Sequence, residues 1–298
     1  MKQIITSLLV LTLLIGFSAC DEESTGPVDP DVLAPTSLRA SSADQALNLT
    51  WTPSTSESQE NFDGYQVRVL NKSTNQFFIE TAPKGTGYKV SNLDNGTLYV
   101  ITVRAVTKNG KESGDFAQIE WAPAIRRSVD VAGQPIRVYA TTSTTFNSAV
   151  DLFNPDGKAE VIPQSGAEFR DRGDLFVYAD SPTSGALVLR TPSAANNKGM
   201  ETQFSTVDYD ADDLDAQTQT TAPLTSTYTR NDVSITAAAT QKGKVVYGRL
   251  KRGTDNIYFR LLITRDPSGR MVRGSGADRY LEMVVSYQHI PNVPFAKQ

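Results

Sequence analysis

The sequence predicts an all-β fold built from two consecutive β-sandwiches. Short segments that alternate apolar and polar residues follow one another along most of the chain. Turn-forming groups such as Asp94-Asn95-Gly96 and Asn154-Pro155-Asp156-Gly157 separate these segments. No stretch keeps the apolar period of about 3.6 residues that an amphipathic helix requires. Short alternating strands with turns between them are the pattern of a sandwich or barrel.

The chain begins with an apolar run, Ile4 to Ala19, behind the basic residue Lys2. The run is shorter than the roughly 20 residues of a membrane-spanning helix. A positive start and a short apolar core are typical of a secretory signal peptide over residues 1–19. Phe17-Ser18-Ala19-Cys20 resembles the lipobox of bacterial lipoproteins, which implies cleavage before Cys20 and a lipid on its thiol. An ordinary signal peptide with a cysteine beside it is the alternative.

Residues 20–34 combine the predicted lipid-bearing cysteine with a polar segment that contains Gly26 and Pro27. This composition is typical of a flexible tether. The acidic group Asp21-Glu22-Glu23 resembles two kinds of lipoprotein sorting signal, for inner-membrane retention and for surface export. Plain solvation of the tether is a third interpretation. We expect a lipid-anchored protein of the bacterial cell envelope, on the periplasmic or surface face of the outer membrane.

Composition excludes several classes of function. The formal net charge of −4 gives no electrostatic footprint for nucleic acid. Cys20 is the single cysteine, so its acylation would leave no thiol for a disulfide, a zinc site or nucleophilic catalysis. His289 is the single histidine, which excludes sites built from two or more histidines of one chain. We expect no cofactor, with calcium as the one candidate.

Residues 35–122 hold strand patterns at 47–51, 65–69 and 99–106. The arrangement resembles a fibronectin type III domain, because Trp51 lies in the second predicted strand and Leu93 precedes Tyr99 by six residues. That spacing matches the tyrosine corner of such sandwiches. The resemblance implies that Trp51 and Tyr99 are core residues and do not bind a ligand.

Residues 123–298 are predicted to form a second, larger β-sandwich of unknown type. Its first residues, 123–130, contain Arg126-Arg127 and are interpreted as a solvated link. Strand patterns follow at 136–140, 149–153, 159–162, 175–178, 186–189, 257–263 and 281–287. The last third faintly resembles uncharacterised bacterial surface lipoproteins, which implies no particular activity.

The densest acidic cluster of the chain runs from Asp208 to Asp215. Alternate aspartates can direct oxygen atoms at calcium, which makes Asp208, Asp210 and Asp212 candidate ligands. A calcium loop of the EF-hand type also needs glycine at its sixth position and glutamate at its twelfth, where this chain has Asp213 and Gln219. We therefore expect an exposed acidic loop without partners rather than a metal site.

Two further motifs are interpreted as having no function. Arg172-Gly173-Asp174 is the tripeptide that integrins read on some fibronectin modules, but it lies outside the fibronectin-like residues and is expected to occur by chance. His289 is expected at the surface or at a sheet edge, since the chain has no Gly-x-Ser-x-Gly nucleophile motif.

These observations predict a non-catalytic, lipid-anchored protein with a structural or binding role. Its predicted partners are the membrane, through the lipid, and an envelope protein or glycan. One alternative is a glycan-binding lipoprotein of a nutrient-uptake system, which an exposed row of aromatic residues would favour. The other is a carboxylate-based glycan hydrolase, which two carboxylates facing each other across a cleft would favour. The aromatic candidates are Tyr139, Tyr178, Tyr228, Tyr247, Tyr258 and Tyr280.

Overall fold

The computed structural model describes residues 31–183, 185–195, 201–216 and 222–296. The predicted signal peptide, Cys20 and most of the predicted tether lie outside the described residues. Val32–Gln298 form one compact unit, so the predicted domain boundary after residue 122 stays a prediction. We call residues 32–122 the N-terminal region and residues 123–296 the C-terminal region. In the described part of the chain, no helix is long and apolar enough to cross a membrane.

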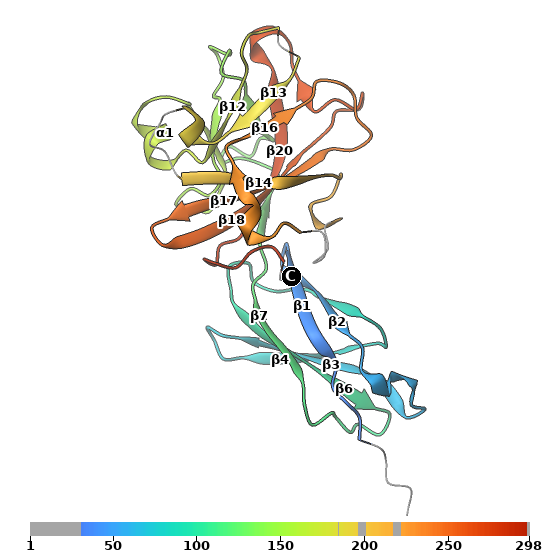
Figure 1. Ribbon diagram of the computed structural model, residues 1–298. Helices are drawn as coiled ribbons and strands as arrows, with labels where there is room; N and C mark the ends of the chain where they lie inside the picture. Colours follow the sequence, from blue (N-terminus) through green and yellow to red (C-terminus); the bar gives the residue numbers. More distant parts are fainter. Residues whose placement is uncertain (1–30, 184, 196–200, 217–221, 297–298) are drawn as a thin grey trace, which may run out of the picture. The chain divides into compact units, whose positions relative to one another are not determined.

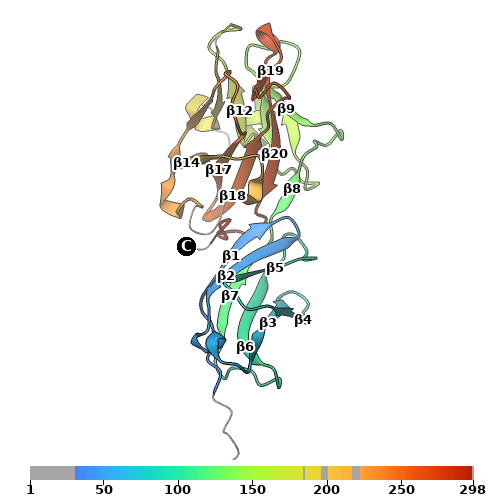
Figure 2. The same ribbon diagram turned by 90° about the vertical axis from the view of Figure 1, so that its right-hand side faces the viewer.

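The N-terminal region contains two antiparallel sheets (Figures 1 and 2). The strand order is β1-β2-β5 in one sheet and β4-β3-β6-β7 in the other. The strands are β1 (Thr36–Ala43), β2 (Ala46–Thr52), β3 (Phe62–Asn71), β4 (Phe77–Ala82), β5 (Gly87–Val90), β6 (Tyr99–Thr107) and β7 (Ala117–Trp121). A short 3-10 helix, η1 (Thr55–Ser58), follows β2.

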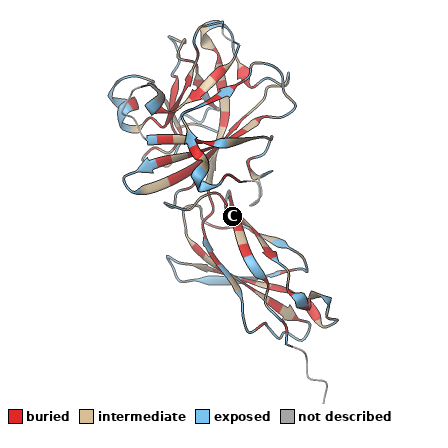
Figure 3. Cartoon of the chain, viewed as in Figure 1, coloured by how far each residue is buried: buried red, intermediate tan, exposed pale blue. Residues whose placement is uncertain are grey.

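Alternation decides which side chains of the N-terminal region enter its core. Along β6, buried residues alternate with partly exposed ones from end to end, as Figure 3 shows by colour. Trp51 and Tyr99 are both buried, as predicted. The ring centroid of Trp51 lies 5.1 Å from that of Tyr65 in an edge-on contact. The hydroxyl of Tyr99 accepts a hydrogen bond of 2.9 Å from the backbone N–H of Asp94, next to Leu93, which confirms the tyrosine corner.

The C-terminal region contains two further sheets, which confirms the predicted all-β class. Their strand orders are β11-β10-β12-β13-β16 and β15-β14-β17-β18-β20-β19, and β8 and β9 also pair with β20. The strands are β8 (Ile125–Arg127), β9 (Ile136–Tyr139), β10 (Ala149–Asp151), β11 (Glu160–Ile162), β12 (Leu175–Tyr178), β13 (Leu187–Arg190), β14 (Glu201–Asp210), β15 (Tyr228–Arg230), β16 (Asp232–Ile235), β17 (Lys244–Arg252), β18 (Asp255–Ile263), β19 (Val272–Arg273) and β20 (Tyr280–Tyr287). The helices are α1 (Gly166–Arg172), η2 (Pro192–Ala195), η3 (Leu214–Ala216), η4 (Thr225–Thr227) and η5 (Gly276–Asp278).

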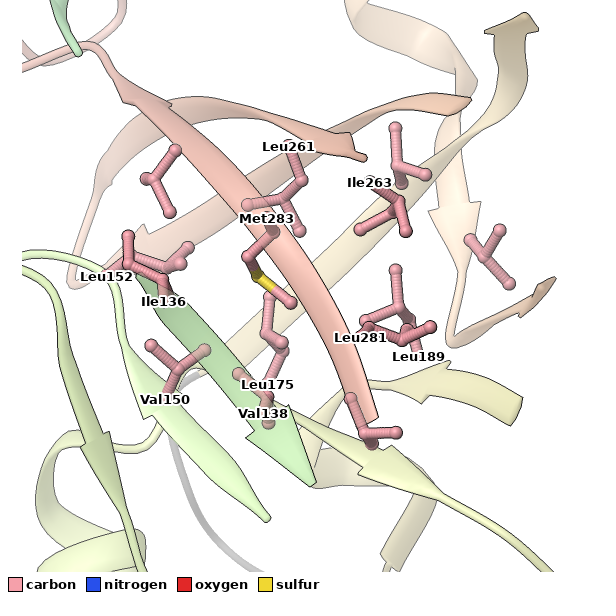
Figure 4. Packing of buried hydrophobic residues seen from close by; sticks show 14 of the residues in the cluster. Ile136, Val138, Val150, Leu152, Leu175, Leu189, Leu261, Ile263, Leu281 and Met283 are labelled. Carbon is pink, nitrogen blue, oxygen red and sulfur yellow. The ribbon is translucent and has the colours of Figure 1, made fainter. Parts of the chain in front are cut away.

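Apolar side chains of both sheets form the main core of the C-terminal region (Figure 4). Leu261 and Ile263 of β18 pack there together with Met283 of β20. The opposite face of β18 is buried as well, because Tyr258 and Leu262 belong to a second apolar cluster that includes Phe295. The period of two along 257–263 predicted one buried face, and the structure buries both.

The segment predicted as a solvated link is a strand. Ile125–Arg127 form β8, which pairs antiparallel with Val285–Tyr287 of β20. The guanidinium of Arg126 also donates a 2.7 Å hydrogen bond to Asp215. The prediction was wrong because an isolated basic pair shows none of the alternation by which a strand is recognised, whereas its partners lie far along the chain.

A buried arginine joins the two regions. Arg260 of β18 is 2 % exposed, and its Nη2 donates to the backbone oxygen of Ser42 in β1 at 3.0 Å. Its Nη1 donates to the backbone oxygen of Leu214 at 2.5 Å, and Nη2 pairs with Asp215 at 3.2 Å. The guanidinium also lies 4.2 Å above the ring of Phe295. The side chain of Arg260 thereby contacts three segments that are distant in sequence, at Ser42, at Leu214-Asp215 and at Phe295.

Ser42 is the other centre of this junction. Its hydroxyl donates to the backbone oxygen of Ala122 at 2.7 Å and accepts from the indole N–H of Trp121 at 3.1 Å. The amide of Gln288, which is also buried, donates to the same hydroxyl and to the oxygen of Ala122 at 3.2 and 3.1 Å. The backbone N–H of Ser42 donates to the oxygen of Phe295 at 2.8 Å. We call Ser42, Trp121, Arg260 and Gln288 the junction network.

Replacing Trp51 by alanine should lower the free energy of unfolding by about 3–5 kcal/mol, because it opens a cavity in the N-terminal core. Tyr99→Phe should cost about 1 kcal/mol, since it removes the acceptor for the N–H of Asp94. Denaturant titration of the full chain measures both changes. Tyr139→Phe, at a partly exposed tyrosine of the C-terminal region, is the control for loss of a hydroxyl. An unchanged unfolding midpoint for Trp51→Ala would contradict the core assignment.

Arg260→Met should destabilise the chain by about 3–5 kcal/mol, because it leaves the buried backbone oxygens of Ser42 and Leu214 without their cationic donor. Arg126→Met is the matched control: Arg126 pairs with the same carboxylate but is partly exposed, so its loss should cost about 1 kcal/mol or less. Both values come from chemical denaturation. Equal, small losses for the two variants would show that the junction network contributes little to stability.

Candidate functional site

The acidic stretch forms ion pairs that the sequence did not predict. Asp208 and Asp210 lie on β14, where Lys244 of β17 approaches them at 3.1 and 3.2 Å. Arg230 also pairs with Asp208 at 3.1 Å, and Arg265 pairs with Asp212 at 2.9 Å. The expectation of an exposed loop without partners was wrong, because strand pairing brings in cations from 22 to 53 residues away.

These carboxylates do not converge on one point. Within the described ranges, no group of three or more acidic, histidine or cysteine side chains could hold a metal ion. The backbone N–H of Gly243 and the guanidinium of Arg265 hold the pKa of Asp212 below its usual value. Calcium at Asp208, Asp210 and Asp212 would have to displace the side chains that now pair with them.

The Arg172-Gly173-Asp174 tripeptide is not presented to solvent. Arg172 ends helix α1 and its guanidinium pairs with Asp151 at 3.1 Å, with Glu160 at 2.7 Å and with Glu168. Asp174 is fully buried. An integrin-type contact needs both charged side chains to be accessible, so the interpretation of this tripeptide as a chance match agrees with its burial.

Of these three residues, Arg172 borders a pocket of about 320 Å³. We call it the carboxylate pocket, and it is lined by Asp151, Phe153, Asn154, Pro155, Asp171, Arg172 and Arg252. The turn predicted at 154–157 shapes one wall, because the side-chain oxygen of Asn154 accepts from the N–H groups of Asp156 and Lys158. The ring of Phe153 stacks on that of Tyr287 at 4.7 Å and contacts the exposed His289 at 4.8 Å.

Asp174 lies behind this pocket without a full set of partners. One of its oxygens, Oδ2, accepts from the backbone N–H of Leu152 at 2.8 Å. The other, Oδ1, has no hydrogen-bond partner among the described residues, and the guanidinium of Arg252 is 4.0 Å away. Burial and then the charge of Asp151 raise the pKa of Asp174 to about 7. Burial also raises the pKa of Asp151 despite its hydrogen bond from Arg172.

The carboxylate pair is poorly arranged for glycan hydrolysis. A hydrolase needs an acid and a second carboxylate that both reach the scissile bond. Asp174 has the raised pKa of an acid but is fully buried and does not line the pocket. Asp151 lines the pocket but is held by Arg172. In this conformation the two carboxylates therefore do not share access to a bound sugar.

The predicted aromatic row divides into three groups. Tyr228, Tyr247 and Tyr258 are buried and belong to the second apolar cluster of the C-terminal region. Tyr178 is partly exposed, but the guanidinium of Arg190 lies 3.7 Å above its ring. Only Tyr139 and Tyr280 come together as neighbours across paired strands, with ring centroids 5.0 Å apart.

Phe146 completes an aromatic cluster with these two tyrosines. Its ring stacks on Tyr139 at 4.2 Å with an interplanar angle of 18°, and it is 46 % exposed. The hydroxyl of Ser143 positions it by accepting from the N–H of Phe146 at 3.0 Å while donating to Asp278 at 2.7 Å. We call Tyr139, Phe146 and Tyr280 the aromatic platform. Sequence reasoning missed Phe146 because it lies in a loop, outside any alternating pattern.

Charged side chains border the aromatic platform on the same sheet face. Glu282 of β20 pairs with Arg137 at 2.9 Å and with Arg273 at 2.7 Å. Burial alone would raise the pKa of Glu282, but the hydrogen bonds from both arginines hold it below its usual value. The guanidinium of Arg137 also lies 5.4 Å from the ring of Tyr280. The platform therefore combines one exposed and two partly exposed rings with fixed polar groups.

Comparison with known proteins places a fibronectin type III domain at residues 33–120. Among solved structures, the FN5 domain of Drosophila Lar is 21 % identical with a TM-score of 0.26, and the match covers 31 % of this chain and 96 % of that one. The FN3 domain of human collagen XX is 19 % identical with a TM-score of 0.25, covering 31 % and 98 %. The Clostridium perfringens spore cortex lytic enzyme SleM is 21 % identical with a TM-score of 0.25, covering 30 % and 28 %. No curated protein matches the chain.

Asp174→Asn should flatten the pH dependence of stability. The pKa of Asp174 is raised in the folded chain, so this residue stabilises the fold at low pH and loses that effect as pH rises through about 7. From pH 5 to pH 8 the wild type should lose roughly 2–3 kcal/mol more than Asp174→Asn. Thermal or urea unfolding at several pH values measures the difference. Asp171→Asn, at the exposed aspartate of α1 three positions earlier, is the control, and parallel curves for wild type and Asp174→Asn would contradict the assignment.

Proposed function

We propose that this protein is a lipid-anchored component of the bacterial cell envelope with a non-catalytic, presenting role. Cys20 carries the lipid, residues 21–34 are the tether, and the fibronectin type III domain raises the C-terminal region above the membrane. The proposal rests on the lipobox-like motif Phe17-Ser18-Ala19-Cys20 at the end of the only long apolar run of the sequence. Several buried acyl chains give firm anchoring, since each buried CH₂ contributes about 0.8 kcal/mol.

The junction network supports the presenting role. A module that only tethers another needs no buried contact with it, and a flexible linker would suffice. Here Arg260 and Gln288 of the C-terminal region donate directly to Ser42 of the fibronectin type III domain. The two regions thus share hydrogen bonds that neither could complete alone. Such a connection suits a protein that holds its C-terminal region in a fixed orientation on its fibronectin type III domain.

Glycan binding is a second candidate function, and the aromatic platform is the observation that favours it. Exposed aromatic rings offer flat apolar faces against which the C–H groups of a sugar can pack, and neighbouring charged groups can bind its hydroxyls. Tyr139, Phe146 and Tyr280 supply the rings, and Arg137 and Glu282 supply the polar groups. A glycan held there would make the protein the binding component of an envelope system.

The lipid anchor predicts that a fatty-acid analogue will label the wild-type chain and will not label Cys20→Ser. Metabolic labelling in a bacterial host, followed by purification and detection of the analogue, measures this. The double variant Cys20→Ser/Ser24→Cys keeps one cysteine in the tether but moves it away from the lipobox, so it should also stay unlabelled. Equal labelling of wild type and Cys20→Ser would rule out the anchor, and labelling of the double variant would show that the position of the cysteine is unimportant.

Phe146→Ala should weaken binding of a glycan by roughly two- to tenfold, the value of one aromatic contact. Calorimetric titration with soluble dextran, starch and xylan identifies a polysaccharide that binds and then compares the variants on it. Tyr178→Ala is the matched control, because the ring of Tyr178 is already covered by Arg190. If none of these polysaccharides binds the wild type, or if both variants bind equally, the aromatic platform is not a site for them.

A further inference from the structure

An apolar surface lies at one edge of the fibronectin type III domain. Strand β4 is the end strand of the order β4-β3-β6-β7, and no described strand pairs with its free side. Three consecutive residues of β4 are large, apolar and exposed: Phe77 by 52 %, Phe78 by 39 % and Ile79 by 49 %. Exposed strand edges of this kind are templates for pairing with another strand, and proteins usually protect them with charges, proline or a covering segment. Glu80 is the only charged residue in β4.

The outer face of the same sheet forms a groove of about 580 Å³ beside this edge. Its floor comes from β3 and β6, and Phe77, Ile79 and Phe116 contribute apolar side chains to it. The register places Phe77 opposite Leu70 and Ile79 opposite Arg68, so Phe77 and Ile79 face the groove together with Arg68. The groove therefore presents alternate side chains of an unpaired strand, which is the geometry that strand addition uses for specificity.

Arg68 gives this edge a charge preference. Its guanidinium lies 3.9 Å above the ring of Phe77, so the arginine leans from β3 towards the edge strand. No carboxylate among the described residues pairs with it. Arg104, the other arginine of the groove, is occupied instead: its Nη1 donates to the backbone oxygens of Ser113 and Gly114, and its Nε is 3.7 Å from Glu112. Arg68 is thus the cation at this edge that can accept an acidic partner.

We propose that β4 is a docking edge for an extended peptide segment of a protein partner, in which apolar residues flank an acidic one. The segment adds to the sheet as a strand beside β4, with its backbone hydrogen-bonded to the free side of β4. Its apolar side chains pack on Phe77 and Ile79, and its carboxylate pairs with Arg68. A bidentate pair between arginine and a carboxylate supplies both energy and orientation. This inference does not depend on the lipid anchor or on the aromatic platform.

The test uses the full chain in detergent and a fluorescent nine-residue peptide that alternates threonine and valine, with glutamate at its centre. A second peptide with lysine at its centre is the control ligand. Fluorescence anisotropy should show the glutamate peptide binding roughly tenfold more tightly than the lysine peptide, the factor that corresponds to about 1.4 kcal/mol. A glutamate peptide with methylated backbone nitrogens on its pairing side should not bind, because strand addition needs those N–H groups.

Arg68→Glu should reverse the preference, so that the lysine peptide binds more tightly, and Arg68→Gln should abolish the difference between the two peptides. Lys89→Glu makes the same change of charge on the other sheet and should leave both affinities unchanged, which separates a local pair from a general effect of net charge. Thermal unfolding of each variant confirms that it is folded. Equal binding of both peptides to the wild type, or an unaltered preference in Arg68→Glu, would overturn the proposal.

Two other occupants of the edge would also overturn it. If a second copy of the chain occupies the edge, the molar mass measured by light scattering should rise to that of a dimer at high concentration. Phe78→Glu should then restore the mass of the monomer. An acidic polysaccharide would give binding of soluble polygalacturonate that depends on Arg68 while neither peptide binds. The expected result is a peptide-binding chain whose mass does not change with concentration and which does not bind polygalacturonate.

Discussion

A charged group that is buried away from water needs compensating partners inside the protein. The fold of this chain depends on the partners that it provides for the buried guanidinium of Arg260. Removing a guanidinium from water costs several kcal/mol unless hydrogen bonds and an opposite charge replace the lost hydration. Ser42 supplies one of those partners from the N-terminal region, and the neighbouring residues Leu214 and Asp215 supply the others. None of these segments can shift by itself without leaving a buried donor or acceptor unsatisfied. The junction network therefore fixes how the ends of β1, β18 and β20 meet.

Much of the fold could be predicted because its signals are local. The alternation along β6 and the spacing of Leu93 and Tyr99 identify a fibronectin type III sandwich within a single segment of sequence. Trp51 follows from the same pattern. The turn at 154–157 is also a local signal, since Asn154 bonds to its own turn and Gly157 has the positive φ of 72° that glycine permits. The tyrosine corner and this turn each depend on residues that lie close together in the sequence.

The features that could not be predicted depend on pairing between distant segments. The aspartates of β14 looked unpaired because Lys244, Arg230 and Arg265 come into range only after the sheet has formed. Arg126 looked solvated because its partner, Asp215, is 89 residues away. The aromatic candidates show the same limit. Composition named the tyrosines, but only the pairing of β9 with β20 separates the partly exposed Tyr139 and Tyr280 from the three that are buried.

The return of the chain end to β1 has a consequence for the order in which the protein can be completed. Gln288 bonds to Ser42 across 246 residues, and Phe295 accepts from the N–H of the same serine. Contacts of such long sequence separation form late and slow folding, because a large loop must close before they contribute. The contacts of Ser42 with Gln288 and Phe295 can therefore form only after residues 288–295 have been synthesised. A chain that ends before Gln288 would lack these hydrogen bonds to Ser42 and the ring of Phe295 over Arg260, and a protease could distinguish it from the chain that has them.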